Sequence, residues 1–570
     1  MPDMSKTGAQ LYLLALKTGG IDYVFTNAGT DFAPILEALL SETPSDGTYP
    51  EFIICPHENM AVAMAQGFYL NSGRPQAAMV HVNVGVANAM CGLLNTARDN
   101  IPLLFASGRT PITEKGRLGS RDNFIHWGQE MFDQAAMLRE LVKWDYELRT
   151  PEQTPTAVTR ALAIAKSAPC GPVYLSLPRE VLAEKVCAPE ENTPEFNAAG
   201  APHPDPQSIK TAADMIANAR APLIITSRAG RTARGVEALG HFAQTFAIPV
   251  VEFAANYLCL ATDHSMHAGF TPAPFLQESD LVIVADAPVP WPPSKMNPPK
   301  ECRIIEMGPD PLYERIPFRG FRSDLTIRTD IALGLERLQD ILSENGLIES
   351  PLIETRRAAL VPRLEEQRAA RLYKAAQPGS YITHSYTSHC LNQALGADGI
   401  LVNERGALRE AMSMTRPGTF FGPTIAGGLG ASIGIALGIK LAAPDRMVAA
   451  ALGDGSCIFN NPVACLQVAV ARDLPILIVV MNNGAWDSVR ASALSVYPDG
   501  LTARANHPPL TSLAPAPDYA GIARACGVEG VTAGDPATLN ATLRHAVKTV
   551  HQERKTVLVD VLIGGSQTVT

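Results

Sequence analysis

The sequence is poor in charge, and its cysteines lack the spacing that disulfide and zinc scaffolds use. Charged residues make up 18% of the 570 residues, below the share of about 25% usual in globular proteins. With 47 basic and 56 acidic residues, the net charge is −9, so the basic surface of a nucleic-acid-binding protein is absent. The ten cysteines are scattered without a CxxC pair, which argues against a disulfide framework and a zinc ribbon.

Long apolar runs are missing as well, although 46% of the residues are hydrophobic. No stretch of about 20 uninterrupted apolar residues occurs, so we expect no transmembrane helix and no membrane partner. The N-terminus lacks the apolar core and small-residue cleavage site of a secretory signal. Together with the unpaired cysteines, these absences favour a compact, oligomeric and cytoplasmic protein.

Short apolar runs of strand length alternate with helical patterns along the whole chain. This alternation predicts an α/β protein with doubly wound parallel sheets. Two segments interrupt it: residues 186–207 are rich in Pro, Glu and Asn, and residues 346–380 carry a charged helical stretch. We therefore predict three α/β domains joined by these two linkers, at residues 1–185, 208–345 and 381–570.

Polar, glycine-rich clusters follow two of the strands expected in the third domain. Residues 453–456 (GDGS) follow the apolar run 447–452, and residues 482–484 (NNG) follow the run 476–481. Open α/β sheets bind ligands at the carboxyl ends of their strands. Glycines let the backbone approach a diphosphate, and carboxylate and amide oxygens suit Mg²⁺. The sequence therefore predicts a metal–diphosphate site at this edge.

These two clusters, each at a strand end, resemble the signature of thiamine diphosphate (ThDP) enzymes. The resemblance implies that ThDP and Mg²⁺ are the cofactors. It also implies that the metal is held by Asp454, Asn483 and the Ala485 carbonyl, and that the diphosphate lies on Gly453, Gly455 and Ser456.

A glutamate in the first domain carries the same resemblance. Glu58 follows the apolar run 52–54 and begins an apolar helical pattern, a position where capping alone favours Glu. In ThDP enzymes, a Glu at this place bonds the aminopyrimidine ring and promotes activation of the cofactor. The family has pyrimidine-binding (PYR), middle and diphosphate-binding (PP) domains in this order. Its cofactor lies between subunits, which implies a homodimer as the minimal active unit and a homotetramer as a common state.

Further segments resemble benzoylformate decarboxylases within this family. Asn27 and Gly29 stand in a segment after the first strand that would border the cofactor, and the adjacent Thr30 hydroxyl would orient a substrate carboxylate. His81 falls on an active-site histidine, and His264 aligns more loosely with a second one. Histidine suits proton transfer near neutral pH.

Three more positions are assigned to the cofactor site by the resemblance. Leu429 aligns with the large apolar residue that wedges beneath the cofactor, and Gly427 belongs to the same glycine-rich loop. Asn88 follows the His81 segment at the spacing of the benzoylformate decarboxylases. On the residues alone, a leucine in a glycine run is as well explained by ordinary core packing.

Other segments depart from the benzoylformate decarboxylases. Gln129 resembles the Gln-Glu loop of acetolactate synthases and 2-hydroxyacyl-CoA lyases. Arg228, Arg231 and Arg234 follow the first strand of the middle domain, where CoA-using members bind the ADP part of CoA. Three arginines beside a glycine turn could bind phosphates, although a solvated loop explains them too. Residues 485–500 match no subgroup.

The combined reading is a ThDP- and Mg²⁺-dependent carbon–carbon lyase or decarboxylase that acts on 2-oxo acids, with carboligase activity. Glu58 would activate the cofactor, His81 and His264 would move protons, Thr30 would orient the substrate, and Gln129 is a further candidate catalytic residue. The alternatives are a 2-hydroxyacyl-CoA lyase, which would release formyl-CoA, and an acetolactate synthase-like carboligase. A catalytically inactive assembly protein of the same fold is the alternative from a different class.

Overall fold

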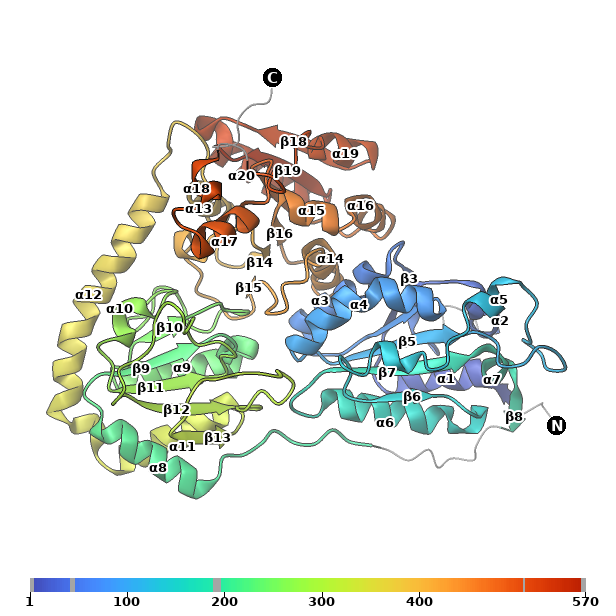
Figure 1. Ribbon diagram of the computed structural model, residues 1–570, viewed down its shortest axis with the longest axis horizontal. Helices are drawn as coiled ribbons and strands as arrows, with labels where there is room; N and C mark the ends of the chain where they lie inside the picture. Colours follow the sequence, from blue (N-terminus) through green and yellow to red (C-terminus); the bar gives the residue numbers. More distant parts are fainter. Residues whose placement is uncertain (1–4, 42–46, 188–195, 506–507, 565–570) are drawn as a thin grey trace.

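The computed structural model describes residues 5–41, 47–187, 196–505 and 508–564. These residues form three domains, each built on a parallel sheet with helices on both faces (Figure 1). The predicted fold class is confirmed. In the part of the chain that the structure describes, no helix is both long and apolar enough to cross a membrane.

The first domain carries a six-stranded parallel sheet in the order β3-β2-β4-β5-β7-β6. Its central strands are mostly apolar because helices cover both faces, as parallel sheets require; β4 is buried at every position. The strands are β2 (Tyr23–Asn27), β3 (Glu51–Ile54), β4 (Ala77–Val80), β5 (Leu103–Arg109), β6 (Asp145–Glu147) and β7 (Pro172–Pro178). The main helices are α1 (Gly8–Thr18), α2 (Ala33–Leu40), α3 (Glu58–Ser72), α4 (Val82–Arg98) and α6 (Thr154–Lys166).

The middle domain has a five-stranded parallel sheet in the order β10-β9-β11-β12-β13. Its strands are β9 (Pro222–Thr226), β10 (Val250–Glu252), β11 (Leu281–Ala285), β12 (Arg303–Gly308) and β13 (Leu325–Arg328). Its helices include α8 (Pro206–Asn218), α9 (Ala233–Thr245) and α11 (Ile331–Glu344). The charged stretch after it forms one helix, α12 (Pro351–Ala375), which runs along the outside of the molecule toward the third domain (Figure 1).

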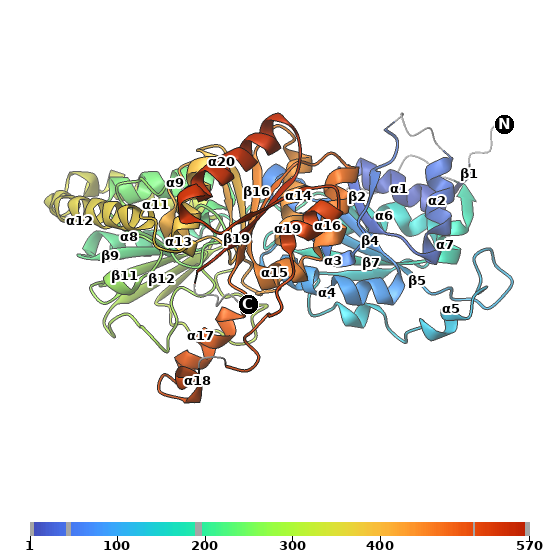
Figure 2. The same cartoon turned by 90° about the horizontal axis from the view of Figure 1, so that it is seen from above.

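The third domain repeats the six-stranded design in the order β15-β14-β16-β17-β19-β18. Its strands are β14 (Ile400–Glu404), β15 (Phe420–Phe421), β16 (Val448–Gly453), β17 (Leu477–Asn482), β18 (Glu529–Ala533) and β19 (Val557–Leu562). Its helices include α13 (His384–Leu395), α14 (Ser432–Ala442), α15 (Asp454–Phe459), α16 (Pro462–Ala471), α19 (Tyr519–Ala525) and α20 (Pro536–Gln552). Two short helices, α17 (Asp487–Val496) and α18 (Leu501–Arg504), project from it as an arm (Figure 2).

Each of the three parallel sheets has an interior point where the strand order reverses. This switch point falls between β2 and β4 in the first domain, between β9 and β11 in the middle domain, and between β14 and β16 in the third domain. A crevice opens outside the carboxyl ends of the strands at such a point, and open α/β sheets bind their ligands there.

Helices α3 and α14 hold the first and third domains together, and both views show them side by side at the centre of the molecule (Figures 1 and 2). Glycines make this close packing possible. A Cβ at Gly67 would lie 2.0 Å from the Ile435 carbonyl oxygen, and one at Gly438 would lie 2.0 Å from that of Met64. Since α3 begins at Glu58 and α14 follows the glycine loop at Gly427, this contact fixes the two segments relative to each other.

The structure adds features that the pattern of apolar runs did not indicate. An antiparallel pair joins β1 (Ser5–Thr7) to β8 (Lys185–Cys187), so an ordered strand reaches into the segment predicted as a linker, and α8 begins before its end. Residues 188–195 of that segment lie outside the described residues. The short edge strands β6, β13 and β15 were also not predicted, because two to four residues at a sheet edge carry no apolar periodicity.

Candidate active site

A buried carboxylate–histidine pair occupies the switch point of the first sheet. His81 follows β4, and its Nδ1 lies 2.5 Å from Oδ1 of Asp31, which follows β2. Two glycines leave room for the pair. A Cβ at Gly29 would lie 2.1 Å from His81 Nδ1, and one at Gly108 would lie 1.8 Å from Asp31 Oδ2. Any other residue at either position would displace one of the two partners.

Asp31 sets the electrostatics of His81. The hydrogen bond to Asp31 is the main cause that raises the pKa of His81, while burial opposes it and the Glu58 charge adds to it. The backbone N–H of Val82 donates to the second carboxylate oxygen of Asp31 at 3.3 Å. The imidazolium form of His81 is therefore favoured to a higher pH than in an ordinary histidine.

Gln129 contacts the other ring nitrogen of His81. The distance from Gln129 Nε2 to His81 Nε2 is 3.3 Å, and Gln129 Oε1 is buried without a partner among the described residues. A neutral Nε2 can accept from the amide, and after rotation of the amide Oε1 can accept from a protonated Nε2. Gln129 can therefore satisfy His81 in both protonation states.

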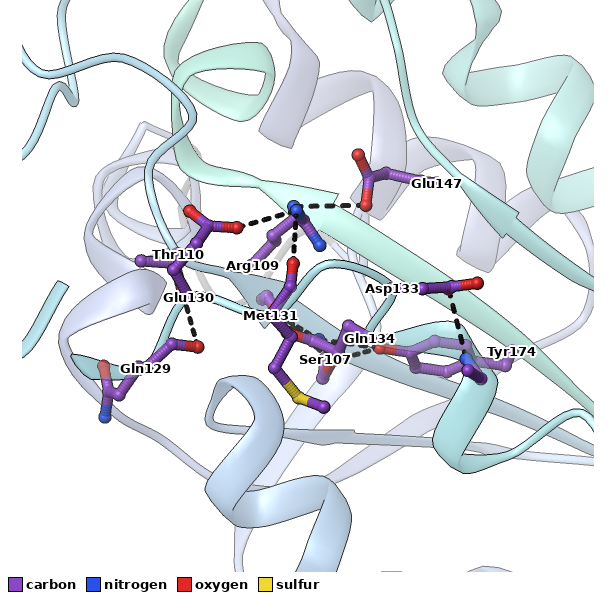
Figure 3. Close-up of polar contacts among 12 residues, drawn as sticks. Ser107, Arg109, Thr110, Gln129, Glu130, Met131, Asp133, Gln134, Glu147 and Tyr174 are labelled. Carbon is purple, nitrogen blue, oxygen red and sulfur yellow. Dashed lines mark hydrogen bonds and ion pairs between the residues drawn. The ribbon is translucent and has the colours of Figure 1, made fainter. Parts of the chain in front are cut away.

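The loop that carries Gln129 is tied to the sheet by a polar network (Figure 3). Thr110 Oγ1 donates to the Gln129 carbonyl, and Arg109 bridges Glu130 at 2.8 Å and Glu147 at 3.2 Å. Gln134 Nε2 donates to the Ser107 hydroxyl and to the Tyr174 hydroxyl, both at 2.8 Å, at the end of the same loop. These bonds place Gln129 at His81 without help from an apolar core.

Glu58 lies at the start of α3, where two side-chain amides hold its carboxylate. Asn27 Nδ2 donates to Oε1 at 3.0 Å, and Asn88 Nδ2 donates to Oε2 at 3.1 Å. His57 caps the helix by accepting from the Asn59 N–H. The Glu58 side chain is fixed and almost fully buried, at 6% exposure, yet each oxygen keeps a lone pair for one more donor.

The glycine loop before α14 is fastened to the same part of the first domain. Asn59 Nδ2 donates to the Gly430 carbonyl at 3.0 Å, and Asn95 Nδ2 donates to the Gly428 carbonyl at 2.9 Å. Glu404, at the end of β14, accepts the three N–H groups of residues 430–432. Half-buried Leu429 therefore stands on a loop held from both domains.

The two polar clusters of the third domain meet, as their positions at strand ends predict. Asp454 Oδ2 accepts from the Gly484 N–H at 2.8 Å, and Oδ1 accepts from the Gly455 N–H at 2.9 Å. Burial raises the pKa of Asp454, while these backbone bonds lower it. Asn483 Oδ1 accepts from the Ala485 N–H, and its Nδ2 donates to Asp487.

The space and the donors at this edge fit a diphosphate and a hard cation. A Cβ added at Gly427, Gly453 or Gly484 would meet no atom within 4 Å, so the backbone faces open space at all three. Buried Ser456 lies in the first turn of α15, where backbone N–H groups favour an anion, although the Gly455 N–H is engaged by Asp454. The described residues include no group of three or more His, Cys, Asp or Glu side chains that could hold a metal. The available oxygens are those of Asp454, the Asn483 amide and the Ala485 carbonyl, which suit Mg²⁺.

Arg228, one of the three arginines expected to bind CoA, is enclosed by protein acceptors. It is buried, and it joins the middle domain to the first. Its guanidinium donates to Asn256 Oδ1, Asn100 Oδ1, the Arg98 carbonyl and Asp99 Oδ1, over 2.8 to 3.3 Å. Four of its five N–H groups are engaged, and at 2% exposure the side chain is closed to a phosphate from solvent.

The other two arginines of that trio are also engaged. Arg231 donates to the Asp99 carbonyl and lies 5.4 Å from the centre of the Tyr257 ring. Arg234 makes a two-point ion pair with Glu336 at the surface. All three arginines therefore contact protein groups in this structure, and their role in binding CoA stays a prediction.

His264 is not brought to the site within the chain. Its Nδ1 accepts from the Met266 N–H at 3.1 Å, and Arg368 donates to its carbonyl. Burial lowers its pKa. In the part of the chain that the structure describes, no hydrogen bond joins His264 to Glu58 or His81, and its catalytic role stays a prediction. Thr30 lies exposed beside Asp31, at the mouth of the first crevice.

Sequence reasoning missed Asp31 and the role of Glu404. Asp31 carried a signal that could have found it, since a carboxylate directly after a strand of a parallel sheet lies where ligands bind. Glu404 could not be assigned, because its partners are backbone groups that only the folded loop presents. Asn59 and Asn95, which hold that loop, lie on helices where asparagine has no fixed meaning.

Comparisons with known proteins agree with this geometry. Residues 6–137, 209–338 and 404–561 match the models of the N-terminal thiamine pyrophosphate (TPP) binding domain, the central domain and the C-terminal TPP binding domain of thiamine pyrophosphate enzymes. Benzoylformate decarboxylase from Pseudomonas aeruginosa is 28% identical, over 93% of this chain and 95% of that protein. The acetolactate synthase large subunit of Haemophilus influenzae is 25% identical, over 98% and 95%. The solved structure of a 4-hydroxybenzoylformate decarboxylase from Rhodococcus jostii superposes with a TM-score of 0.77 at 22% identity, covering 98% of this chain and 99% of that one.

Three α/β domains with ligand crevices in the first and third define a cofactor-dependent enzyme of the three-domain type. The chain belongs to the thiamine diphosphate-dependent enzyme family, among relatives that are decarboxylases and carboligases.

Proposed function

We propose that the protein is a ThDP- and Mg²⁺-dependent decarboxylase of free 2-oxo acids, with carboligase activity on the aldehydes that it forms. The observation that carries this proposal is the Glu58 carboxylate. Two amides fix it at the start of α3, and the Asp31–His81 pair stands close enough for the Glu58 charge to raise the pKa of His81. The two motifs expected to bind the cofactor, at residues 453–456 and 482–484, are also present in full.

The residues of the first crevice have separate roles in this proposal. Bound ThDP supplies a nucleophilic carbon and an electron sink. Glu58 binds the cofactor's pyrimidine ring and exchanges a proton with it. His81, kept protonated by Asp31, donates a proton to the reacting carbon, and Gln129 keeps the ring oriented before and after the transfer. Thr30 orients the substrate carboxylate.

Proton balance explains why an acid is needed. Decarboxylation converts R–CO–COO⁻ and one H⁺ into R–CHO and CO₂, so a proton must reach the carbon that loses CO₂. His81 is suited to deliver it, because its raised pKa keeps the imidazolium available near neutral pH. In the carboligase reaction, the carbon that loses CO₂ bonds to a second aldehyde instead, and the proton goes to the oxygen of that aldehyde.

A 2-hydroxyacyl-CoA lyase has less support, because the arginines that would bind CoA are engaged within the protein. The inter-subunit cofactor site and the homotetramer stay predictions. In support, the exposed face of α4 presents Val84 and Cys91 beside the glycine loop, and Phe459 and Val463 are exposed on α15 and α16. Exposed apolar side chains of this kind are typical of a subunit interface.

Replacement of Glu58 by Gln tests the proposal. We expect Glu58→Gln to fold normally and to lose about 100- to 10,000-fold in kcat, which is the range that proton transfer by a positioned group contributes. CO₂ release would be measured with a panel of free 2-oxo acids, and formyl-CoA release with a panel of 2-hydroxyacyl-CoA thioesters. Exchange of the thiazolium C2 proton, followed by NMR, gives a readout independent of the substrate.

Glu37→Gln, on the exposed face of α2, is the matched control and should keep wild-type values. Retention of most activity and C2 exchange by Glu58→Gln would overturn the assignment of Glu58. Formyl-CoA release with inert free acids would instead establish the lyase. Failure of the wild-type protein to bind ThDP would favour an assembly protein.

A further inference from the structure

The switch point of the third sheet carries an arginine in an unusual backbone conformation. Arg405 directly follows β14, and it forms an isolated bridge with Leu452, the residue before the Gly453–Asp454 turn. Arg405 and Asp454 therefore flank the crevice between β14 and β16, where sheets of this type bind ligands.

The backbone around Arg405 is held in place by its neighbours. Its φ is +59°, in the left-handed region that residues with a Cβ seldom adopt. Asn403 clamps the turn, because its Oδ1 accepts the N–H groups of Gly406 and Ala407 and its Nδ2 donates to the Ala407 carbonyl. A Cβ at Gly406 would lie 2.4 Å from the Leu452 nitrogen, so the turn is pressed against β16.

The side chain of Arg405, in contrast, is free. It is exposed, and no hydrogen bond or ion pair engages its guanidinium among the residues that the structure describes. The neighbouring Glu404 is occupied by the N–H groups of residues 430–432. A strained backbone that presents an uncommitted charge beside a ligand crevice is typical of a functional position.

We propose that Arg405 binds a second anionic group of the substrate, so that the enzyme selects 2-oxo acids with a carboxylate, sulfonate or phosphonate at the far end. This inference rests on the proposed decarboxylase function. The planar guanidinium fork matches such oxyanions in two-point geometry. The cofactor diphosphate already has the α15 N-terminus and the oxygens that would hold Mg²⁺, so Arg405 remains for the substrate.

A pair of substrates of equal length tests the proposal, namely 2-oxoglutarate and the neutral 2-oxopentanoate. We expect the wild-type protein to prefer 2-oxoglutarate in kcat/KM. In Arg405→Asn, which removes the charge but tolerates the left-handed backbone, that preference should fall by roughly 10- to 100-fold, as for loss of one charge-assisted bond. Most of this loss should appear in KM, and Arg405→Lys should restore part of it.

Two measurements separate the possible causes. The Kd for ThDP, measured by calorimetry with Mg²⁺, should stay within about twofold in Arg405→Asn, and a large rise would show that the arginine serves the diphosphate instead. Arg160→Ala, an exposed arginine on α6, controls for net charge and should leave the preference unchanged. A wild-type preference for 2-oxopentanoate, or an equal response of both substrates to Arg405→Asn, would overturn the proposal. Inactivity of the wild type on both acids and on the wider panel would instead count against the decarboxylase function.

Discussion

The middle domain and the two domains beside it are all built on a parallel sheet. They differ in which residues lie at the point where the strand order reverses. In the third domain, Gly427, Gly453 and Gly484 face open space, and in the first domain Gly29 and Gly108 make room for the polar side chains of His81 and Asp31. In the middle domain, Arg228 and Arg231 fill the corresponding place and bind residues 98–100 of the first domain. A switch point therefore becomes a ligand site only where backbone and side chains leave both space and free donors.

The comparison also shows what an arginine does in each setting. At the middle switch point, the guanidinium of Arg228 is consumed by protein acceptors and fastens two domains together. At the third switch point, the guanidinium of Arg405 has no such partner among the described residues, although its backbone is the more constrained of the two. The residue type is the same, and the surrounding acceptors decide between a structural and a functional role.

The largest effect is expected where the open crevice loses its metal ligand. Asp454→Ala should abolish ThDP- and Mg²⁺-dependent activity, because among the described residues Asp454 is the carboxylate that contacts both the turn after β16 and the turn after β17. The wild-type melting temperature should rise with ThDP and Mg²⁺ by ligand linkage, and the variant should show no rise in differential scanning fluorimetry. Asp398→Ala, at the surface, is the control. A wild-type rise in Asp454→Ala would mean that the cofactor lies elsewhere.

Removal of Arg228, which lies at the switch point of the middle domain, should affect stability rather than substrate choice. Arg228→Ala leaves Asp99 buried without its main counter-charge, and loss of one partner of such a pair costs about 3–5 kcal/mol. The pKa of Asp99 is already raised by burial, and the charge of Arg228 opposes that rise. Urea denaturation should show the loss, and Asp99→Asn added to Arg228→Ala should recover part of it. If Arg228→Ala kept full stability and lost only turnover of CoA thioesters, the middle crevice would be a CoA site after all.

A smaller effect is expected in the first crevice, where Asp31 acts through His81. Asp31→Asn should lower kcat/KM by about 10- to 100-fold and move the alkaline limb of the pH profile to lower pH. The sign follows from the structure: the hydrogen bond of Asp31 raises the pKa of His81, so its loss lets the imidazolium deprotonate earlier. Glu58 still faces the ring and keeps part of the shift.

Stability should follow the same linkage. Because the folded pKa of His81 lies above that of an unfolded histidine, the pair stabilises the protein fully below about pH 6.5 and loses this contribution as pH rises through the folded pKa. Asp122→Asn, which removes a carboxylate near the same loop without touching His81, should leave the pH profile unchanged. An unshifted alkaline limb in Asp31→Asn would show that His81 is not the acid.

The sequence predicted the parts of the molecule that periodicity and strand-end chemistry encode. Alternating apolar runs gave three parallel sheets, and the glycine and carboxylate clusters after β16 and β17 were expected to meet, as Asp454 and Gly484 do. The hydrogen-bond partners of side chains that meet only in the folded protein could not be predicted from the sequence. Nothing in the sequence distinguishes Arg228, which is enclosed by four acceptors, from Arg234, six positions later on the same segment.

Replacement of Arg234 gives the smallest expected effect. Comparison with Arg228→Ala tests whether burial decides how much an arginine contributes to stability. Arg234 forms a two-point ion pair with Glu336, but both side chains are exposed, and water screens such pairs so that many contribute nothing measurable. Arg234→Ala should therefore leave the urea midpoint and the kinetics unchanged, whereas Arg228→Ala should lower the midpoint strongly. An equal change of the urea midpoint in the two variants would contradict this explanation. Arg234 makes its ion pair within the middle domain, so burial against the first domain would then not account for the effect of Arg228.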